Sequence, residues 1–106
     1  MNLFSILALV LSFIVPIIYI VVAFSIDHRF AKQIDKETLR KWHEDPANWK
    51  GSIYHNPSDP RMLPPKKTKA MGWTINTANK RSVIGFLIAI GFTLITTAVI
   101  IIVEVI

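Results

Sequence analysis

The side chains that could carry acid-base or metal chemistry are few and scattered through the polar middle of the chain. They are His28, His43, His55, Glu44, Asp45 and Asp59, and the chain has no cysteine. Two histidines that share a metal ion on a helix are usually spaced as His-x-x-x-His, a spacing that is missing here. Adjacent His43, Glu44 and Asp45 would point in different directions on a helix. We therefore expect no catalytic site, no metal, no cofactor and no enzymatic activity.

A second group of side chains has the chemistry of binding rather than catalysis. The candidates for contact with a partner or a lipid headgroup are Trp49, Tyr54, Asn56, Asp59, Arg61, Lys66, Lys67, Lys69, Trp73 and Asn76. A basic residue held near an anionic bilayer contributes roughly 1 kcal/mol of binding. Asn56-Pro57 and Asp59-Pro60 each place a side-chain acceptor before a rigid proline, which predicts two successive tight turns. We expect this segment to hold one shape.

The apolar residues that must position this segment are collected at the two ends of the chain. The chain has 106 residues, of which 52% are hydrophobic and 18% charged, and its mean hydropathy is +0.44. An uncharged run of the length of residues 3–26 spans roughly 36 Å as a helix, enough to cross a bilayer. Residues 82–105 form a second apolar segment, in which the uncharged run is 83–103 and Glu104 is the one charged residue. The predicted fold class is an all-α membrane protein, a hairpin of two transmembrane helices with a partly ordered loop.

The first apolar run contains Pro16. Because proline lacks an N–H, it should free one backbone carbonyl and bend the helix near Ser12 and Phe13. A cleaved signal peptide is the alternative for this run. No basic residue precedes Leu3, and the run exceeds the roughly 7–15 apolar residues of a signal peptide. We therefore expect this segment to remain as a transmembrane helix.

The loop divides into two parts. Residues 27–47 have apolar positions at near-helical spacing and predict an amphipathic juxtamembrane helix that ends before Pro46. Residues 48–81 form a region rich in Trp, Pro and Lys. There we expect a short β-hairpin, with Trp49–Tyr54 as one strand that pairs with Met62 and Leu63.

The second apolar run carries small residues at helical spacing. Gly85, Ala89 and Thr93 are four residues apart, which lets another helix approach closely. Such residues are also ordinary in membrane helices. The alternatives are therefore a face that packs on the first helix, a face that packs on a partner, and no special role. Asn79 or Ser82 is expected to cap the start of this helix.

The charges predict an orientation in the membrane. All 12 Lys and Arg residues lie between Arg29 and Arg81. Basic loops are retained on the cytoplasmic side. We therefore expect the loop to be cytoplasmic and both termini to lie outside. Soluble nucleic acid is not expected as a partner, because the basic loop is tethered to lipid at both ends.

The stretch from Trp49 to Asn76 resembles a small bacterial membrane domain of uncharacterised function. Its members share the pattern W-x-G-x-x-Y-x-N-P-x-D-P-R, a basic segment, and then G-W-T-x-N shortly before a transmembrane helix. The matching positions here are Trp49, Gly51, Tyr54, Asn56, Pro57, Asp59, Pro60, Arg61, Pro65, Lys66, Gly72, Trp73, Thr74 and Asn76. This domain also occurs attached to proteins similar to the immunity protein for a sporulation-delaying toxin. The resemblance implies a protein of the bacterial cytoplasmic (inner) membrane.

Two functions are expected from these observations. The first is a non-enzymatic small integral membrane protein that acts as an accessory or interaction subunit for a larger membrane protein, related to immunity or transport, or for a second copy of itself. The alternative is a sensor or binder at the membrane surface, whose basic aromatic loop captures an anionic lipid or a peptide. The lipid bilayer is a partner in both.

Overall fold

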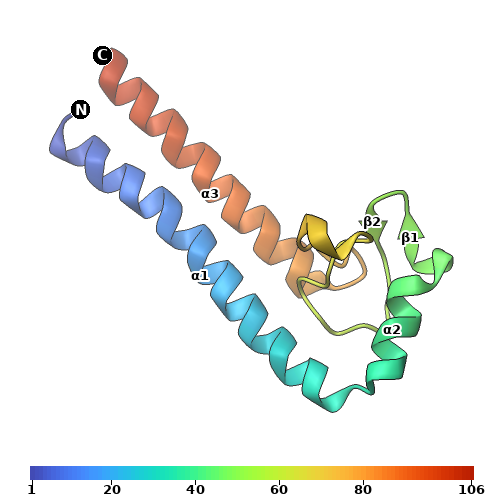
Figure 1. Ribbon diagram of the computed structural model, residues 1–106. Coiled ribbons are helices and arrows are strands. Elements are labelled where there is room, and N and C mark those ends of the chain that lie inside the picture. Colours follow the sequence, from blue (N-terminus) through green and yellow to red (C-terminus); the bar gives the residue numbers. More distant parts are fainter. The chain divides into compact units, whose positions relative to one another are not determined.

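A computed structural model describes all residues of the chain, Met1–Ile106 (Figure 1). Its elements in chain order are helix α1 (Leu3–Gln33), helix α2 (Lys36–Glu44), a 3-10 turn (Pro46–Asn48), strands β1 (Trp49–Lys50) and β2 (Ile53–Tyr54), a second 3-10 turn (Lys69–Met71) and helix α3 (Lys80–Val105). The chain forms two compact units. The helical-pair unit is Met1–Val21 with Gly85–Ile106, and the middle unit is Val22–Ile84. The predicted mostly helical fold, with a small two-stranded sheet, is confirmed.

Helices α1 and α3 are long and apolar enough to cross a membrane. They have 31 and 26 residues, and only 11% and 6% of their most apolar windows are buried within the protein. A core helix of a soluble protein would bury most of such a surface. Most of the apolar surface of these two helices is therefore open, as the surface of a lipid-facing helix would be. Helix α1 also runs past Ile26, the expected end of the span.

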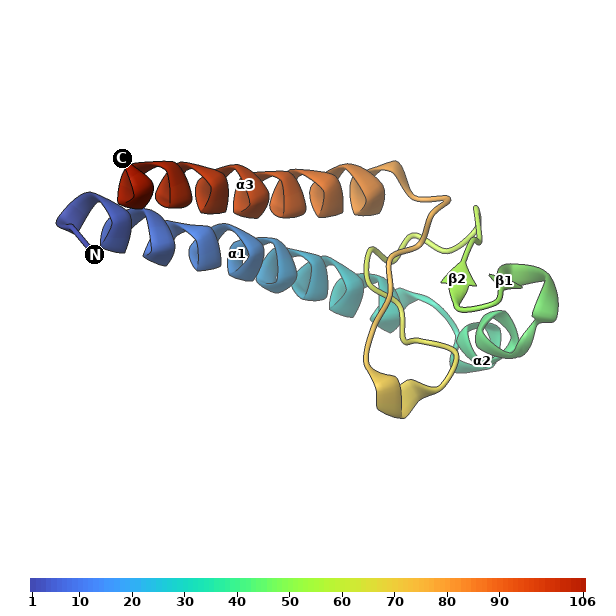
Figure 2. The same ribbon diagram turned by 90° about the horizontal axis from the view of Figure 1, so that it is seen from above.

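Within the helical-pair unit, α1 and α3 lie side by side, with both termini at the same end (Figures 1 and 2). Small residues make the contact. Gly85 lies under the ring of Tyr19, and a Cβ atom there would fall 2.9 Å from the ring Cδ2. Ala89 is buried, and the Thr93 hydroxyl reaches α1. Of the alternatives for this face, packing against the first helix is the one observed.

The contact of Thr93 falls where Pro16 weakens α1. Pro16 has no N–H to donate to the carbonyl of Ser12, four residues earlier. The Thr93 Oγ1 lies 3.3 Å from that carbonyl oxygen, and 3.0 Å from the carbonyl of Ala89 in its own helix. The single hydroxyl proton of Thr93 is thus shared between its own helix and the acceptor that proline leaves unpaired, a compensation that matters most where no water is present.

The expected amphipathic helix over 27–47 is divided in two. Asp35 adopts φ −59° and ψ 136°, which is outside the helical region, so α1 ends at Gln33 and α2 starts afresh at Lys36. On α2, Arg40 forms ion pairs with Glu37 and Glu44. Helix α2 ends before Pro46, as expected. The chain can therefore change direction between the two helices.

The β-hairpin is present, but the predicted pairing was wrong. Trp49 pairs with Tyr54, and Lys50 with Ile53, in an antiparallel register. Gly51 adopts φ 64°, a left-handed conformation that turns the chain in the middle of the expected strand. Met62 and Leu63 do not pair with this segment, because their N–H groups bind Asp27 of α1.

Replacement of Gly85 tests the helix contact. Gly85→Ala puts a methyl group against the Tyr19 ring, and we expect it to lower the free energy of unfolding by about 1–3 kcal/mol. Gly91→Ala is the matched control, since no heavy atom lies within 4 Å of a Cβ there. It should have no effect or a small stabilising one. Thermal unfolding followed by circular dichroism in maltoside micelles measures both, and equal destabilisation by the two variants would contradict the packing.

Candidate functional site

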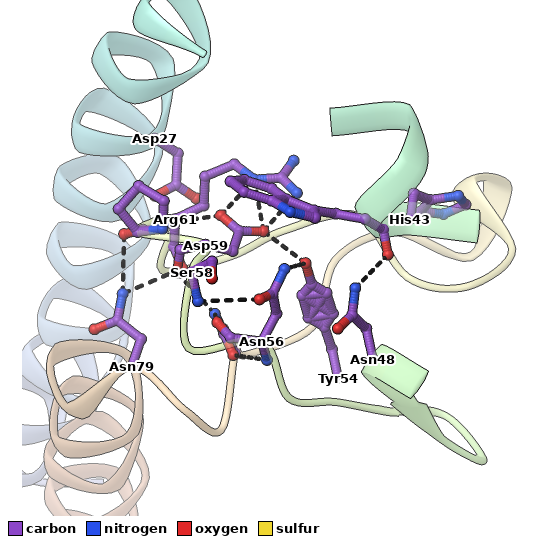
Figure 3. Close-up of polar contacts among 12 residues, drawn as sticks. Asp27, His43, Asn48, Tyr54, Asn56, Ser58, Asp59, Arg61 and Asn79 are labelled. Carbon is purple, nitrogen blue, oxygen red and sulfur yellow. Dashed lines mark hydrogen bonds and ion pairs between the residues drawn. The ribbon is translucent and has the colours of Figure 1, made fainter. Parts of the chain in front are cut away.

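The middle unit is built around a cluster of buried polar side chains. We call this cluster the polar core, and it consists of Tyr54, Asn56, Asp59, Arg61 and Asn76. All five belong to the candidate residues proposed from the sequence. Figure 3 labels four of them, which point toward one another from the end of β2 and the turn that follows it. These residues were thus predicted as candidates from the sequence, and the fold brings them together in the interior of the middle unit.

Asn76 lies at the centre of the polar core and is fully buried. Its Oδ1 accepts from the N–H of Asn56 at 3.0 Å and from that of Ala78 at 3.1 Å. Its Nδ2 donates to the carbonyls of Asn56 and Asp59, both at 2.9 Å. Both donors and both acceptor positions of the amide are therefore used. This one side chain joins the two proline turns to the segment that leads into α3.

Asp59 and Arg61 form the charged part of the polar core, and Tyr54 binds to it. The Tyr54 hydroxyl donates to Asp59 Oδ2 at 2.8 Å and accepts from Asn56 Nδ2 at 3.1 Å. Asp59 is also paired with Arg61, whose Nη2 lies 2.7 Å from the same oxygen (Figure 3). A buried carboxylate is tolerated only with such partners. The chain supplies them within seven residues, so the turn carries its own counterion.

The hydroxyl of Tyr54 is held in its neutral form. Its burial, together with the hydrogen bond to the negative charge of Asp59, raises its pKa from 10.0 to about 12, although the donor from Asn56 acts in the opposite direction. A tyrosinate at this position would lose its bond to Asp59 and face a like charge. Tyr54 therefore serves as a donor and not as a base.

Asp27 joins the turn segment to the end of α1. Its two carboxylate oxygens accept from the N–H groups of Met62 and Leu63 at 2.6 and 2.8 Å. Charge-assisted bonds of this kind are stronger than those between neutral groups. The sequence analysis missed this residue. Its position could have identified it, because Asp27 is the first charged residue after the apolar run and a carboxylate next to an apolar segment needs hydrogen-bond partners.

Two polar residues join the same segment to the start of α3. Asn79 caps this helix, because its Oδ1 accepts from the Arg81 N–H at 3.0 Å while its Nδ2 donates to the Pro60 carbonyl at 2.9 Å (Figure 3). Ser82 is buried, and its hydroxyl donates to the Met62 carbonyl. Of the two caps considered from the sequence, Asn79 and Ser82, the structure has Asn79. The contacts across the loop were not expected.

Trp49 and the histidines also hold the fold together. The Trp49 ring meets the Tyr54 ring edge-on, with centroids 4.9 Å apart, and its Nε1 donates to the His43 carbonyl at 2.8 Å. The Nε2 of His43 lies 2.9 Å from the Lys66 carbonyl. His55 Nδ1 lies 2.8 Å from the Thr77 hydroxyl. These histidine contacts are with backbone and hydroxyl groups of the middle unit.

The remaining candidates lie at the surface. Lys67 and Lys69 are exposed, and Lys66 is half-buried. Trp73 is 58% exposed, with one ring edge against Phe24 of α1 at a centroid distance of 4.9 Å. The ten candidates therefore separate into two groups. Trp49 and the polar core maintain the shape of the middle unit, whereas the three lysines and Trp73 are available to a partner or a lipid.

Comparison with known proteins identifies part of this segment. Residues 57–83 match a family model described as "Family of unknown function (DUF5808)". The matched stretch runs from the first proline turn to the first turn of α3, about a quarter of the chain, and it includes Asp59, Arg61 and Asn76. The expected uncharacterised domain is confirmed to this extent. No curated protein and no solved structure shows significant similarity to the chain.

Replacement of Asn76 tests the polar core. Asn76→Asp keeps the shape of the side chain but turns its two donors into an oxygen that faces the carbonyls of Asn56 and Asp59. We expect a loss of about 3 kcal/mol or more in the stability of the middle unit, because buried acceptors lose their partners. Hydrogen exchange at the Asn56 and Thr77 amides should accelerate. Ser58→Ala, at an exposed side chain, is the control. Unchanged exchange in Asn76→Asp would show that the network is not needed.

The raised pKa of Tyr54 predicts a loss of stability at high pH. The folded state holds this proton more tightly than the unfolded state, so the contribution is complete below pH 10 and is lost as the pH rises to about 12. Its size is roughly 2–3 kcal/mol. Tyr54→Phe should remove this part of the pH dependence. Tyrosinate absorbance of a Tyr19→Phe variant, which leaves Tyr54 alone, reports the titration directly, and ionisation near pH 10 in the folded protein would contradict the assignment.

Proposed function

We propose that the protein is a non-enzymatic small integral membrane protein that acts as an accessory or interaction subunit for a larger membrane protein. Two observations support the membrane location: the apolar surfaces of α1 and α3 are open, and both helices have the length of a span. The folded middle unit between them is the part that would meet the partner.

The observation that carries the proposal is that the polar groups of the polar core are bonded within the protein. Its amide and carboxylate groups are bonded to one another and to the backbone, and Asp27 and Ser82 fasten the same segment to the ends of both long helices. A satisfied buried network favours one conformation. A surface that is already ordered loses less entropy when it binds. The middle unit has the build of a preformed docking surface.

The proposed location is the bacterial cytoplasmic membrane, with the middle unit in the cytoplasm and both termini outside. The confinement of all 12 Lys and Arg residues to positions 29–81 supports this orientation. Reporter tags at the two termini test it in intact cells, and a terminus found in the cytoplasm would reverse the assignment.

The resemblance of residues 49–76 to a domain attached to immunity-like membrane proteins supports the choice of partner. We propose a membrane protein of an immunity or transport system, with a second copy of this chain as the alternative partner.

Co-purification from native membranes tests this function. The tagged full chain in mild detergent should retain a membrane partner, and Asn76→Asp, which disrupts the polar core, should retain less of it, with a loss of up to about 90% for a tenfold fall in affinity. Ser58→Ala should behave as the unchanged protein. A monomer without any retained partner, or equal retention by both variants, would count against a docking role of the middle unit.

A second candidate function is favoured by the surface around the second 3-10 turn. Met71 and Trp73 are 68% and 58% exposed, and they lie beside the exposed Lys67 and Lys69. Aromatic and cationic side chains in this combination favour the headgroup region of a bilayer. In this candidate function the middle unit is a sensor or binder that captures an anionic lipid or a peptide at the membrane surface.

A further inference from the structure

The middle unit contains a pocket whose lining combines α2 with the segment after the proline turns. Its volume is about 210 Å³, and its walls are formed by Lys36, Leu39, Arg40, His43, Arg61, Pro65 and Lys69. No pattern in the sequence predicts this pocket, because the two contributing segments are some 25 residues apart. His43 joins them, since its Nε2 lies 2.9 Å from the Lys66 carbonyl.

The lining of this pocket is cationic. It includes two lysines and two arginines but no carboxylate. Arg40 is shared between Glu37 and Glu44, which lie outside the lining, and Arg61 is paired with the buried Asp59. Lys36 and Lys69 have no ion pair. The pocket lining therefore includes two cations without a counterion, Lys36 from α2 and Lys69 from the second 3-10 turn.

Arg61 is the most rigid donor of the pocket. Its side chain is only 11% exposed, and Asp59 holds it through the Nε and Nη2 atoms. The Nη1 group lies outside this pair. A guanidinium that is fixed by a buried carboxylate loses little freedom when it binds an anion.

We propose that this pocket binds a phosphate ester. Arginine and lysine together are the usual partners of phosphate oxygens, the arginine through its planar fork and the lysine as a point charge. The volume is below the roughly 300 Å³ at which pockets for drug-sized ligands begin, so a small anionic group fits better than a large ligand. Leu39 and Pro65 provide an apolar wall for the carbon chain of the ester.

The phosphate could belong to a lipid headgroup or to a soluble ester, and the chemistry of recognition is the same for both. If the phosphate belongs to a lipid, it is the ligand of the second candidate function, and the inference then rests on the proposed membrane location. With a soluble ester as the source, it is independent of that function.

The test uses the full chain in maltoside micelles, which contain no phosphorus. Titration calorimetry with inorganic phosphate and with glycerol phosphate measures binding directly. The same titration is then repeated with phosphatidylglycerol in the micelles. Competition by the lipid would identify a headgroup as an occupant, whereas unchanged binding of glycerol phosphate would identify a soluble ester. Either result supports a phosphate-ester site.

Two double variants distinguish the pocket from general attraction by a basic loop. Lys36→Glu with Lys69→Glu reverses both unpaired cations of the pocket. Lys41→Glu with Lys67→Glu makes the same change in net charge on α2 and the lysine segment, at exposed positions outside the lining. We expect the first pair to weaken binding about tenfold or more, because two charge-assisted contacts are lost, and the second pair by less than about threefold.

Equal loss in the two double variants, or no binding of phosphate or phosphatidylglycerol by the unchanged chain, would overturn the proposal. Near-ultraviolet circular dichroism, to which the buried Trp49 and Tyr54 contribute, shows whether the fold is intact. If the pocket variant is unfolded, the single variants Lys36→Ala and Lys69→Ala replace it, each expected to weaken binding about threefold or more. Co-purification of a partner is measured separately, so failure of the docking role and failure of the phosphate site are distinguishable.

Discussion

The buried amide of Asn76 is the interaction on which the middle unit depends. Between β2 and α3 the backbone is mostly irregular, and apart from two isolated bridges and one 3-10 turn its N–H and C=O groups have no regular structure to pair with. Buried backbone groups without partners are costly. Asn76 provides two donors and two acceptors at one point, and it uses them on the backbone of Asn56, Asp59 and Ala78. Hydrogen bonds from one side chain thus replace the backbone hydrogen bonds that a β-strand would have formed.

The two buried carboxylates extend this arrangement by different means. Asp59 is neutralised by Arg61 and receives the Tyr54 hydroxyl, so its charge is balanced within the turn. Asp27 has no such cation bonded to it and is instead satisfied by two backbone N–H groups from Met62 and Leu63. The first carboxylate shapes the turn, and the second fixes it to α1. Together with Asn79 and Ser82 at α3, they make the polar segment a folded unit that both long helices enter.

In the apolar helical-pair unit, too, a side chain distant in sequence binds an unpaired backbone group. Pro16 leaves the Ser12 carbonyl without its helical donor, and Thr93 provides a replacement from α3. Gly85 and Ala89 make room for this approach. In both units, therefore, a backbone group that local structure leaves unpaired is satisfied by a side chain distant in sequence. The side chains of Lys66, Lys67, Lys69 and Trp73 do not bind backbone groups in this way, and they lie at the surface of the protein.

The sequence by itself determined the features that depend on local chemistry. A helix satisfies the backbone N–H and C=O groups of the two long uncharged runs, so both helices were predictable. The prolines after Asn56 and Asp59 favour turns, and asparagine at position 79 is a good helix cap, so these features were predictable too. The tertiary structure decided which polar side chains are buried and with what. Asp59 and Asp45 have the same carboxylate side chain, yet the first is buried and the second is exposed. The partners of Asp27 are 35 and 36 residues away, and the cationic pocket joins α2 to a distant loop. No local preference encodes such pairings, because they depend on which backbone groups remain unpaired after the helices and turns have formed.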